Sequence, residues 1–243
     1  MRIFGLLGFP LEHSLSEAYF NDKFEREGIE DTTYQNFDFE HITNFLNWCK
    51  DHPELAGFNV TIPHKEAIIE HLDELSEEAE RVGAVNCVKV IEDGMIGYNT
   101  DVYGFERAVE QFISESTKAL ILGTGGAAKA ASYVFDQMGV EFLYVSRNPD
   151  GTDLGYEDLD DAILEDYHLI VNCTPVGMYP YLNDCPPIPY EFLNSKNVLF
   201  DLIYNPEKSL FLIKGEEKGT RIQNGLTMLY LQAEMAWKIW NES

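Results

Sequence analysis

A glycine-rich turn between a short apolar run and an amphipathic stretch is the feature that most constrains how this chain can fold. The run covers residues 119–122, the turn GTGGAA covers 123–128, and the stretch ends at Gly139. In this G-x-G-x-x-A pattern the first glycine makes a tight turn and the second lets the backbone approach a pyrophosphate. The pattern therefore indicates dinucleotide binding, with a methyl-donor site or a purely structural turn as alternatives.

Strand-like and helix-like stretches alternate along the chain, and this alternation predicts an α/β fold. Strands are expected at residues 3–8, 57–62, 84–91, 95–99, 119–122, 142–146, 169–172 and 198–202. Helices are expected from Ser16 to Gly28, at 42–49, from Asp101 to Phe112, from the glycine turn to Gly139, near 157–164, and at 209–218 and 226–240. No glycine- or serine-rich linker is present, so domain boundaries are expected in short connections near 100–102 and 223–225.

The charge balance limits the kind of ligand that the protein can bind. The 243 residues include 17 Lys and Arg against 42 Asp and Glu, a formal net charge of −25. Such a chain lacks the clustered positive charge that nucleic-acid backbones and anionic membranes require. If the ligand is an anion, a few local donors must overcome a repulsive field.

Cysteine usage and hydropathy indicate the compartment. No apolar run approaches the roughly 18 residues of a membrane span, and the apolar stretch 1–10 is too short and too poor in basic residues for a signal peptide. The four cysteines, Cys49, Cys87, Cys173 and Cys185, form no CxxC pair. We therefore expect reduced thiols in a cytoplasmic protein.

The residues after the second strand of the glycine-turn block indicate which dinucleotide binds. A NAD site places an acidic residue there to accept from the ribose 2′-hydroxyl, whereas this chain has Ser146-Arg147-Asn148. A guanidinium can pair with a 2′-phosphate and stack on adenine. We therefore interpret Arg147 as a ligand of the NADP 2′-phosphate, with a solvated surface arginine as the alternative. No second cation follows, and Asp150 adds an acid, so the sequence predicts only a modest preference for NADP over NAD.

Several polar residues stand beside apolar strands in the first part of the chain. They are Ser14, Ser16, Asn59, Thr61, Lys65, Asn86 and Asp101. Each of these residues can also be explained by a purely structural role. Ser16 and Asp101 fit helix N-caps, Lys65 fits a solvated first helical turn after Pro63, and Asn86 fits a strand edge.

Taken together, these residues belong to motifs that stand in a specific order. They are HSLS at 13–16, GFNVTIPHK at 57–65, GAVN at 83–86, NTD at 99–101, GTGGAA at 123–128, NCTPVGM at 172–178, DLIYNP at 201–206 and NGLTML at 224–229, followed by Gln232. In these motifs the chain resembles, over nearly its whole length, the shikimate dehydrogenase family, the NADP-dependent reductases of 3-dehydroshikimate.

The resemblance implies a role for each matching residue. Lys65 and Asp101 match the catalytic pair: Lys65 protonates the alkoxide that hydride transfer leaves, and Asp101 keeps that ammonium charged and aimed. Substrate binding is implied for Ser14, Ser16, Asn59, Thr61, Asn86, Tyr204 and Gln232. Cofactor binding is implied for Gly123, Thr124, Gly125, Gly126, Ala127, Ser146, Arg147, Asn148, Leu202 and Gly225. Glu77 matches a position that some members place near the cofactor, and no metal is implied.

The resemblance also implies the architecture. Residues 1–101 with 224–243 would form an α/β substrate-binding domain and residues 102–223 a Rossmann-type, doubly wound NADP-binding domain, with the active site between them. Expected partners are shikimate or 3-dehydroshikimate, with no nucleic acid and no membrane, in a monomer or homodimer.

Two alternatives share this fold. One is a paralogue that also oxidises quinate, often with NAD. The presence of both Ser14 and Ser16 disfavours the quinate-oxidising paralogue, because several such paralogues lose one of these two hydroxyls. The other is a non-catalytic dinucleotide sensor, which would lack Lys65 or Asp101, and this chain has both. An arginine in place of an acid at residue 147 also argues against a methyltransferase.

Overall fold

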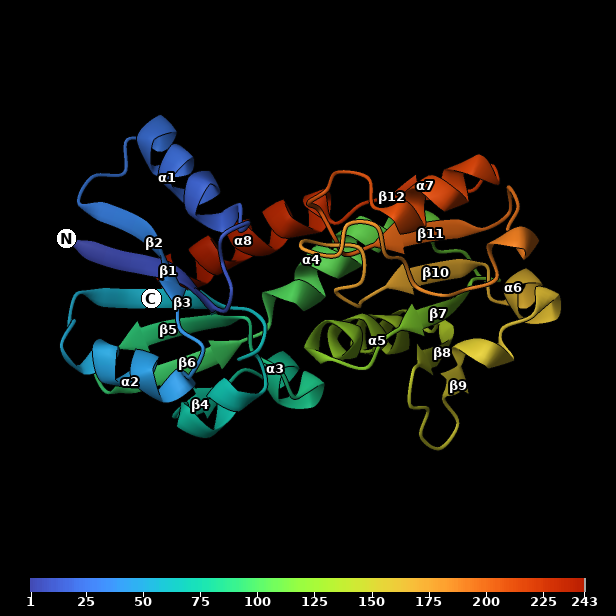
Figure 1. Ribbon diagram of the computed structural model, residues 1–243. Coiled ribbons are helices and arrows are strands. Elements are labelled where there is room, and N and C mark those ends of the chain that lie inside the picture. Colours follow the sequence, from blue (N-terminus) through green and yellow to red (C-terminus); the bar gives the residue numbers. More distant parts are fainter. Residues whose placement is uncertain (243) are drawn as a thin grey trace. The chain divides into compact units, whose positions relative to one another are not determined.

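The computed structural model describes residues 1–242, and the chain divides into two compact units (Figure 1). Unit 1 comprises residues 1–100 and 233–242, and unit 2 comprises Asp101–Gln232. The expected α/β class with two domains is confirmed. Residues 224–232 pack with unit 2 because Met228 lies in its core. The functional division into 1–101 with 224–243 and 102–223 stays a prediction.

Unit 1 contains a mixed six-stranded sheet in the order β2-β1-β3-β5-β6-β4. Its strands are β1 (Arg2–Gly8), β2 (Thr32–Asp38), β3 (Leu55–Val60), β4 (Glu74–Leu75), β5 (Cys87–Ile91) and β6 (Gly94–Tyr98). Strands β1, β2 and β3 run parallel, whereas β5 is antiparallel to both β3 and β6. The hairpin β5–β6 was expected, but β2 was not.

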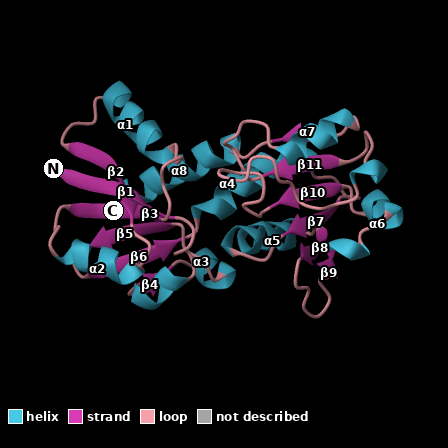
Figure 2. Ribbon diagram, viewed as in Figure 1, coloured by secondary structure: helices cyan, strands magenta, loops and turns pink. Residues whose placement is uncertain are grey.

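Helices cover both faces of this sheet (Figure 2). The helices of unit 1 are α1 (Ser16–Glu27), α2 (Ile42–Lys50), the 3-10 helix η1 (Ala67–His71), α3 (Glu77–Val82) and the last turns of α8 (Leu226–Asn241). Phe4 of β1 packs with Phe20 of α1 and Trp240 of α8, and Leu7 lies on the opposite face with Phe45 of α2. The alternation of side chains along β1 thus supplies both cores.

Unit 2 contains a parallel six-stranded sheet in the order β12-β11-β10-β7-β8-β9. Its strands are β7 (Lys118–Leu122), β8 (Glu141–Ser146), β9 (Leu154–Gly155), β10 (Leu169–Asn172), β11 (Val198–Asp201) and β12 (Arg221–Gln223). The order reverses between β7 and β10, which is the doubly wound pattern with its ligand crevice at the switch point.

The helices of unit 2 lie on both faces of its sheet (Figure 1). They are α4 (Thr100–Val109), α5 (Gly126–Met138), α6 (Asp161–Asp166), α7 (Leu210–Glu217), the first turns of α8, and the 3-10 helices η2 (Glu110–Phe112), η3 (Tyr156–Asp158) and η4 (Tyr190–Phe192). Phe105 of α4 and Phe135 of α5 pack on one face, and Leu164 of α6 and Phe211 of α7 pack on the other.

One crossover of this sheet has no helix. Residues 147–153 join β8 to the parallel strand β9 as a loop, where a parallel connection usually needs a dozen or more residues with a helix (Figure 2). Strand β9 is correspondingly short, with only Leu154 and Gly155 pairing with β8. The loop therefore follows Ser146 directly and carries Arg147 and Asn148.

Candidate active site

The topology of unit 1 brings the polar motifs to one edge of its sheet. Parallel strands β1 and β3 end there, antiparallel β5 begins there, and β6 ends there. The edge is tied by backbone hydrogen bonds from Thr61 N to Leu7 O (2.8 Å) and from Val60 N to Asn86 O (2.8 Å). It gathers the predicted residues that follow or precede these strands: Ser14, Ser16, Thr61, Lys65 and Asn86.

The serine motif after β1 forms a local turn. Ser14 Oγ accepts a hydrogen bond from Ser16 N (3.2 Å), and helix α1 begins at Ser16 with Leu15 as its N-cap. The prediction that Ser16 caps this helix is therefore wrong, because Ser14 supplies the acceptor instead. Ser16 is buried, and its hydroxyl makes no hydrogen bond to any residue in 1–242.

Lys65 lies in a turn, not in a helix. Residues 62–66 form turns and a bend, and η1 begins only at Ala67, so the predicted first helical turn is wrong. His64 N donates to Thr61 O (2.9 Å), and the buried His64 ring bonds through Nε2 to Phe39 O (2.6 Å). Val85 N donates to Lys65 O (2.8 Å). These contacts fix the Lys65 backbone while its side chain stays half-buried.

A buried chain of hydrogen bonds leads from β2 to the start of α4. The Tyr34 hydroxyl donates to Asn59 Oδ1 (2.9 Å), and Asn59 Nδ2 donates to Asn86 O (3.1 Å). Asn86 Nδ2 donates to Thr100 Oγ1 (3.0 Å), and Asn86 Oδ1 accepts from Thr100 N (2.6 Å). Asn86 lies in a bend just before β5 and not on a strand as predicted.

Asp101 follows Thr100 in the first turn of α4. The helix begins at Thr100, so the prediction of Asp101 as its N-cap is wrong. The buried Asp101 is instead held through its neighbour, which Asn86 anchors. Sequence reasoning missed the supporting residues Tyr34 and Thr100; the NTD motif gave a signal for Thr100 and none for Tyr34.

The glycine turn of unit 2 fits a pyrophosphate. It follows β7 at the switch point, with Gly123 at φ +100° and Gly125 as the N-cap of α5. A Cβ at Gly125 would meet open space, and no side chain caps this helix terminus. The first N–H groups of a thirteen-residue helix are thus directed at the place where a phosphate would lie. Gly126 and Ala127 form its first turn, and Thr124 is exposed.

The end of β8 offers further donors. Ser146 is 8% exposed, and its Oγ has no hydrogen-bond partner among the described residues. Arg147 and Asn148 are exposed, and Arg147 forms no ion pair within residues 1–242 despite the many acidic residues. An unsatisfied buried hydroxyl beside an unpaired guanidinium fits the 2′-phosphate end of NADP.

The remaining predicted residues of unit 2 lie near the ends of β11 and β12. Leu202 and Tyr204 follow β11 in a loop, and Gly225 N donates to Ile203 O (3.1 Å). A Cβ on Gly225 would lie 2.1 Å from Leu202 O, so this close approach requires glycine. Gln232 lies in α8 and donates through Nε2 to Leu229 O (2.8 Å).

Glu77 has an ordinary structural role. It is the first residue of α3, where it is exposed and pairs with Arg81 (2.5 Å). Within residues 1–242 no cluster of three or more His, Cys, Asp or Glu side chains could hold a metal ion. No helix in the same range has the length and apolar character that a bilayer crossing requires.

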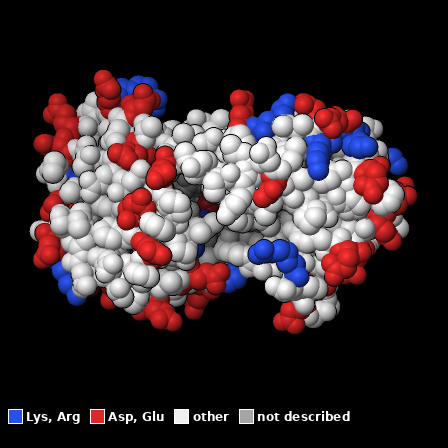
Figure 3. All heavy atoms as spheres, viewed as in Figure 1, with Lys and Arg blue, Asp and Glu red and all other residues white. Residues whose placement is uncertain are grey.

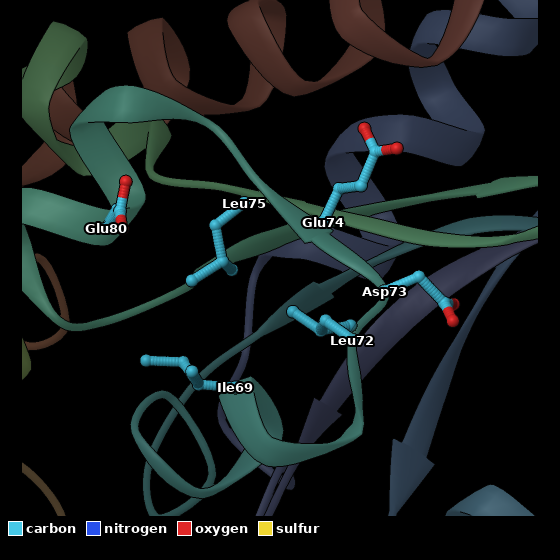
Figure 4. A pocket seen from close by; sticks show the side chains of 6 residues that line it. All are labelled: Ile69, Leu72, Asp73, Glu74, Leu75 and Glu80. Atoms are coloured by element: carbon cyan, nitrogen blue, oxygen red, sulfur yellow. The ribbon is translucent and has the colours of Figure 1, made fainter.

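A cavity of about 410 Å³ lies in unit 1, and none of the predicted substrate or cofactor residues lines it. Figure 4 shows its lining side chains: Ile69, Leu72, Asp73, Glu74, Leu75 and Glu80. Asp73 already accepts from Met95 N (2.8 Å). Its carboxylates would repel an anionic substrate, so we do not assign it to the reaction.

The charged side chains on the visible face of the molecule are mainly acidic. Figure 3 shows Asp and Glu spread over this face, with Lys and Arg gathered at fewer places. The net charge of −25 therefore opposes anions over most of this face. Binding of an anionic ligand depends on the few local donors described above.

Comparison with known proteins identifies the family. The family model of the shikimate dehydrogenase substrate-binding domain matches residues 6–88. The NADP(+) shikimate dehydrogenase of Caldicellulosiruptor saccharolyticus is 37% identical over 99% of this chain and 92% of its own length. That of Methanococcus maripaludis is 36% identical over 98% and 91%.

A solved structure extends this likeness to the fold. The shikimate dehydrogenase from Thermus thermophilus, crystallised with NADP(H) and shikimate, has a TM-score of 0.87 to this chain at 32% identity. The match covers 99% of this chain and 94% of that one. With relatives this similar over nearly the whole length of both chains, this protein belongs to the shikimate dehydrogenase family.

Proposed function

We propose that this protein catalyses the reversible reduction of 3-dehydroshikimate to shikimate with NADPH, a step of aromatic amino acid biosynthesis. The observation that carries the proposal is the convergence of Ser14, Ser16, Thr61, Lys65 and Asn86 at one edge of the unit 1 sheet. Hydroxyl groups, an amide and one ammonium suit a polyhydroxylated ring with a carboxylate and a ketone.

The substrate contacts divide by chemistry. Ser14 and Ser16, with the Tyr204 hydroxyl, donate hydrogen bonds to the carboxylate, and a charged acceptor strengthens each of them. Ring hydroxyls and the ketone are read by Thr61, Asn86, Asp101 and Gln232. Asn59 acts one step away, since its side chain binds Tyr34 and the Asn86 carbonyl.

Proton transfer falls to Lys65 and Asp101. When bound, NADPH supplies the hydride that converts the ketone to an alkoxide. Lys65 stabilises the developing negative charge and donates a proton to that oxygen, and in the reverse direction it accepts the alcohol proton. Asp101 accepts a hydrogen bond from a substrate hydroxyl and orients the ammonium.

NADP is held by unit 2 in this proposal. Gly123, Thr124, Gly125, Gly126 and Ala127 receive the pyrophosphate on backbone N–H groups. Ser146, Arg147 and Asn148 hold the adenosine 2′-phosphate, and Leu202 and Gly225 line the nicotinamide end. Residues 1–101 with 224–243 form the substrate-binding domain, which the family match at 6–88 supports, and 102–223 form the cofactor domain.

The finer assignments extend the same proposal. We place the enzyme in the cytoplasm, which the four free cysteines support. We expect a monomer or homodimer that binds neither nucleic acid nor membranes, as its charge of −25 suggests. Light scattering of the purified protein at several concentrations measures the oligomeric state.

One assay tests the activity and its alternatives. Purified protein is given shikimate or quinate with NADP⁺ or NAD⁺, and reduced cofactor is followed by absorbance. We expect the largest kcat/KM with shikimate and NADP⁺. Preference for quinate with NAD⁺ would instead identify the paralogue, and cofactor binding without turnover would identify a sensor.

A further inference from the structure

Asp201 is a buried carboxylate that the proposed mechanism does not use. It ends β11 beside Asn172, the last residue of β10, and its side chain is 0% exposed. Its Oδ1 accepts from Asn172 Nδ2 (3.0 Å) and from Ile203 N (3.0 Å), and its Oδ2 accepts from Ser209 Oγ. All three donors face one carboxyl group at the edge of the sheet where the glycine turn also lies.

On one side, this network reaches the glycine turn. Asn172 Oδ1 accepts from Thr174 N (3.1 Å) and from Thr174 Oγ1 (2.6 Å). A Cβ at Gly123 would lie 2.9 Å from the Thr174 methyl group, so Thr174 packs directly against the turn. Asn172 therefore connects the Asp201 carboxylate with the backbone that receives the pyrophosphate.

On the other side, the network reaches the loop after β11. Ile203 N donates to Asp201, and Ile203 O accepts from Gly225 N. These two hydrogen bonds fix Ile203 and, with it, the preceding residue Leu202. Ser209 is the N-cap of α7, and its Oγ also accepts from Leu212 N (3.4 Å). Asp201 thus accepts hydrogen bonds from the loop after β11 and from the N-cap of α7.

We propose that Asp201 is a positioning residue for the dinucleotide site, and that its ionised carboxylate holds the glycine turn and the 202–206 loop in the arrangement that binds NADPH. The inference rests on the proposed function. It predicts that NADPH affinity depends on the charge of a residue that solvent does not reach.

The charge on Asp201 changes within an accessible pH range. Burial raises the pKa of Asp201 to about 6, while hydrogen bonds from Ser209, Ile203 and Asn172 hold it down. It forms no ion pair with any residue of the described chain. Among the described residues, two titratable groups interact electrostatically with Asp201: Cys173 after β10 and Tyr190 in η4. Asp101 also interacts electrostatically with Cys173. Burial raises the pKa of both Cys173 and Tyr190, so both stay neutral near pH 6.

The test compares NADPH affinity in wild type and Asp201→Asn across pH 5–8, measured by fluorescence titration without substrate. An amide accepts from Asn172 and Ile203 and can donate to Ser209, so the fold is retained. The ligand's own titration is common to both proteins and cancels in the ratio of their Kd values. We expect the variant's Kd to exceed that of wild type about five- to tenfold at pH 8, within the usual range for coupled sites, and to approach it at pH 5.

Ser209→Ala provides a second readout. Loss of this donor raises the pKa of Asp201. On acidification, the NADPH affinity of Ser209→Ala should therefore fall at a higher pH than that of wild type. Ser76→Ala removes an equivalent helix cap of α3, and Asp160→Asn replaces the carboxylate cap of α6; neither should move it. Equal Kd values for Asp201→Asn and wild type at pH 8, or a ratio independent of pH, would overturn the inference alone. Absence of NADPH binding by wild type at every pH would overturn the proposed function and this inference with it.

Discussion

Asn86 accepts the backbone N–H of Thr100 on its side-chain oxygen at 2.6 Å and so fixes the residue that precedes Asp101. The same asparagine accepts from Asn59 through its carbonyl oxygen (3.1 Å), and Asn59 is held by the Tyr34 hydroxyl (2.9 Å). A residue of the proposed substrate site therefore also organises the start of α4. In the proposed complex its hydrogen-bonding capacity is divided between the substrate and the protein's own backbone and side chains.

Tyr34→Phe tests this chain at its far end. Loss of the hydroxyl leaves Asn59 Oδ1 buried without its donor, which costs about 1–3 kcal/mol in the free energy of unfolding. We also expect a higher KM for shikimate, because Asn59 supports the Asn86 carbonyl. Chemical denaturation and steady-state kinetics measure both effects. Tyr181→Phe, which removes a hydroxyl from a side chain 67% exposed, is the matched control; equal behaviour of the two variants would contradict the argument.

Lys65→Ala should remove the proton donor to the developing alkoxide. Loss of such a group usually costs about 10²–10⁴-fold in turnover, whereas the KM for shikimate should change far less. The backbone bond from Val85 N to Lys65 O persists in the variant, so the turn should be retained. Lys50→Ala, at an exposed lysine on α2, is the control. A kcat within a few-fold of wild type would show that Lys65 is only a solvated lysine.

Strands with continuous apolar runs could be predicted from the sequence, and strands at sheet edges could not. Strand β10 has the predicted bounds Leu169–Asn172 because its four residues are all buried. Strand β2 escaped prediction because the run TTYQNFD buries only Tyr34 and Phe37, a spacing that indicates no strand. Its position is set by pairing with β1, which local sequence does not encode.

The site shows the same division between local and long-range information. Its motif residues could be named from the sequence, but their geometry depends on tertiary contacts. Pro63 suggested a helix at Lys65, whereas the His64 ring is bonded to Phe39 O, 25 residues away, and holds a turn there. Tyr34 carried no local signal, and Asp201 stood in the DLIYNP motif without an assigned role, because their partners Asn59 and Asn172 lie 25 and 29 residues away.

Ser14→Ala and Ser16→Ala should separate binding from local structure. In the proposed complex each hydroxyl donates to a carboxylate remote from the reacting carbon, so we expect KM for shikimate to rise about tenfold or more with kcat nearly unchanged. Only Ser14→Ala also removes the acceptor of Ser16 N, and it should lower the free energy of unfolding by about 0.5–2 kcal/mol. Unchanged KM in both variants would leave the serines with a structural role alone.

Asp201→Asn should affect stability in the direction opposite to cofactor affinity. The folded pKa of Asp201, about 6, exceeds its ordinary value of 3.8. The protonated form therefore contributes stability that is fully present below pH 3.8 and is lost as pH rises through about 6. At pH 7 the neutral amide should raise the free energy of unfolding by on the order of 1–3 kcal/mol relative to wild type.

Urea unfolding of both proteins between pH 4 and 8 measures this difference, because the other carboxyl groups titrate alike in the two and cancel. We expect the gain of Asp201→Asn to disappear toward pH 4. A variant that is less stable than wild type at pH 7 would show that the ionised carboxylate stabilises the fold, and would contradict the cost of burial assigned to it here.

Arg147→Ala should change the choice of cofactor. Arg147 stands alone on the loop that replaces a crossover helix, with Asp150 nearby in sequence and no second cation, so wild type should prefer NADP⁺ by a modest margin. The variant should show a higher KM for NADP⁺ and nearly unchanged use of NAD⁺, which has no 2′-phosphate for the guanidinium to bind. The measurement is kcat/KM for both cofactors in wild type, Arg147→Ala and the control Arg107→Ala, an exposed arginine paired with Glu110 in the same unit. A variant that loses both cofactors equally would show that Arg147 stacks on adenine or supports the loop without reading the phosphate.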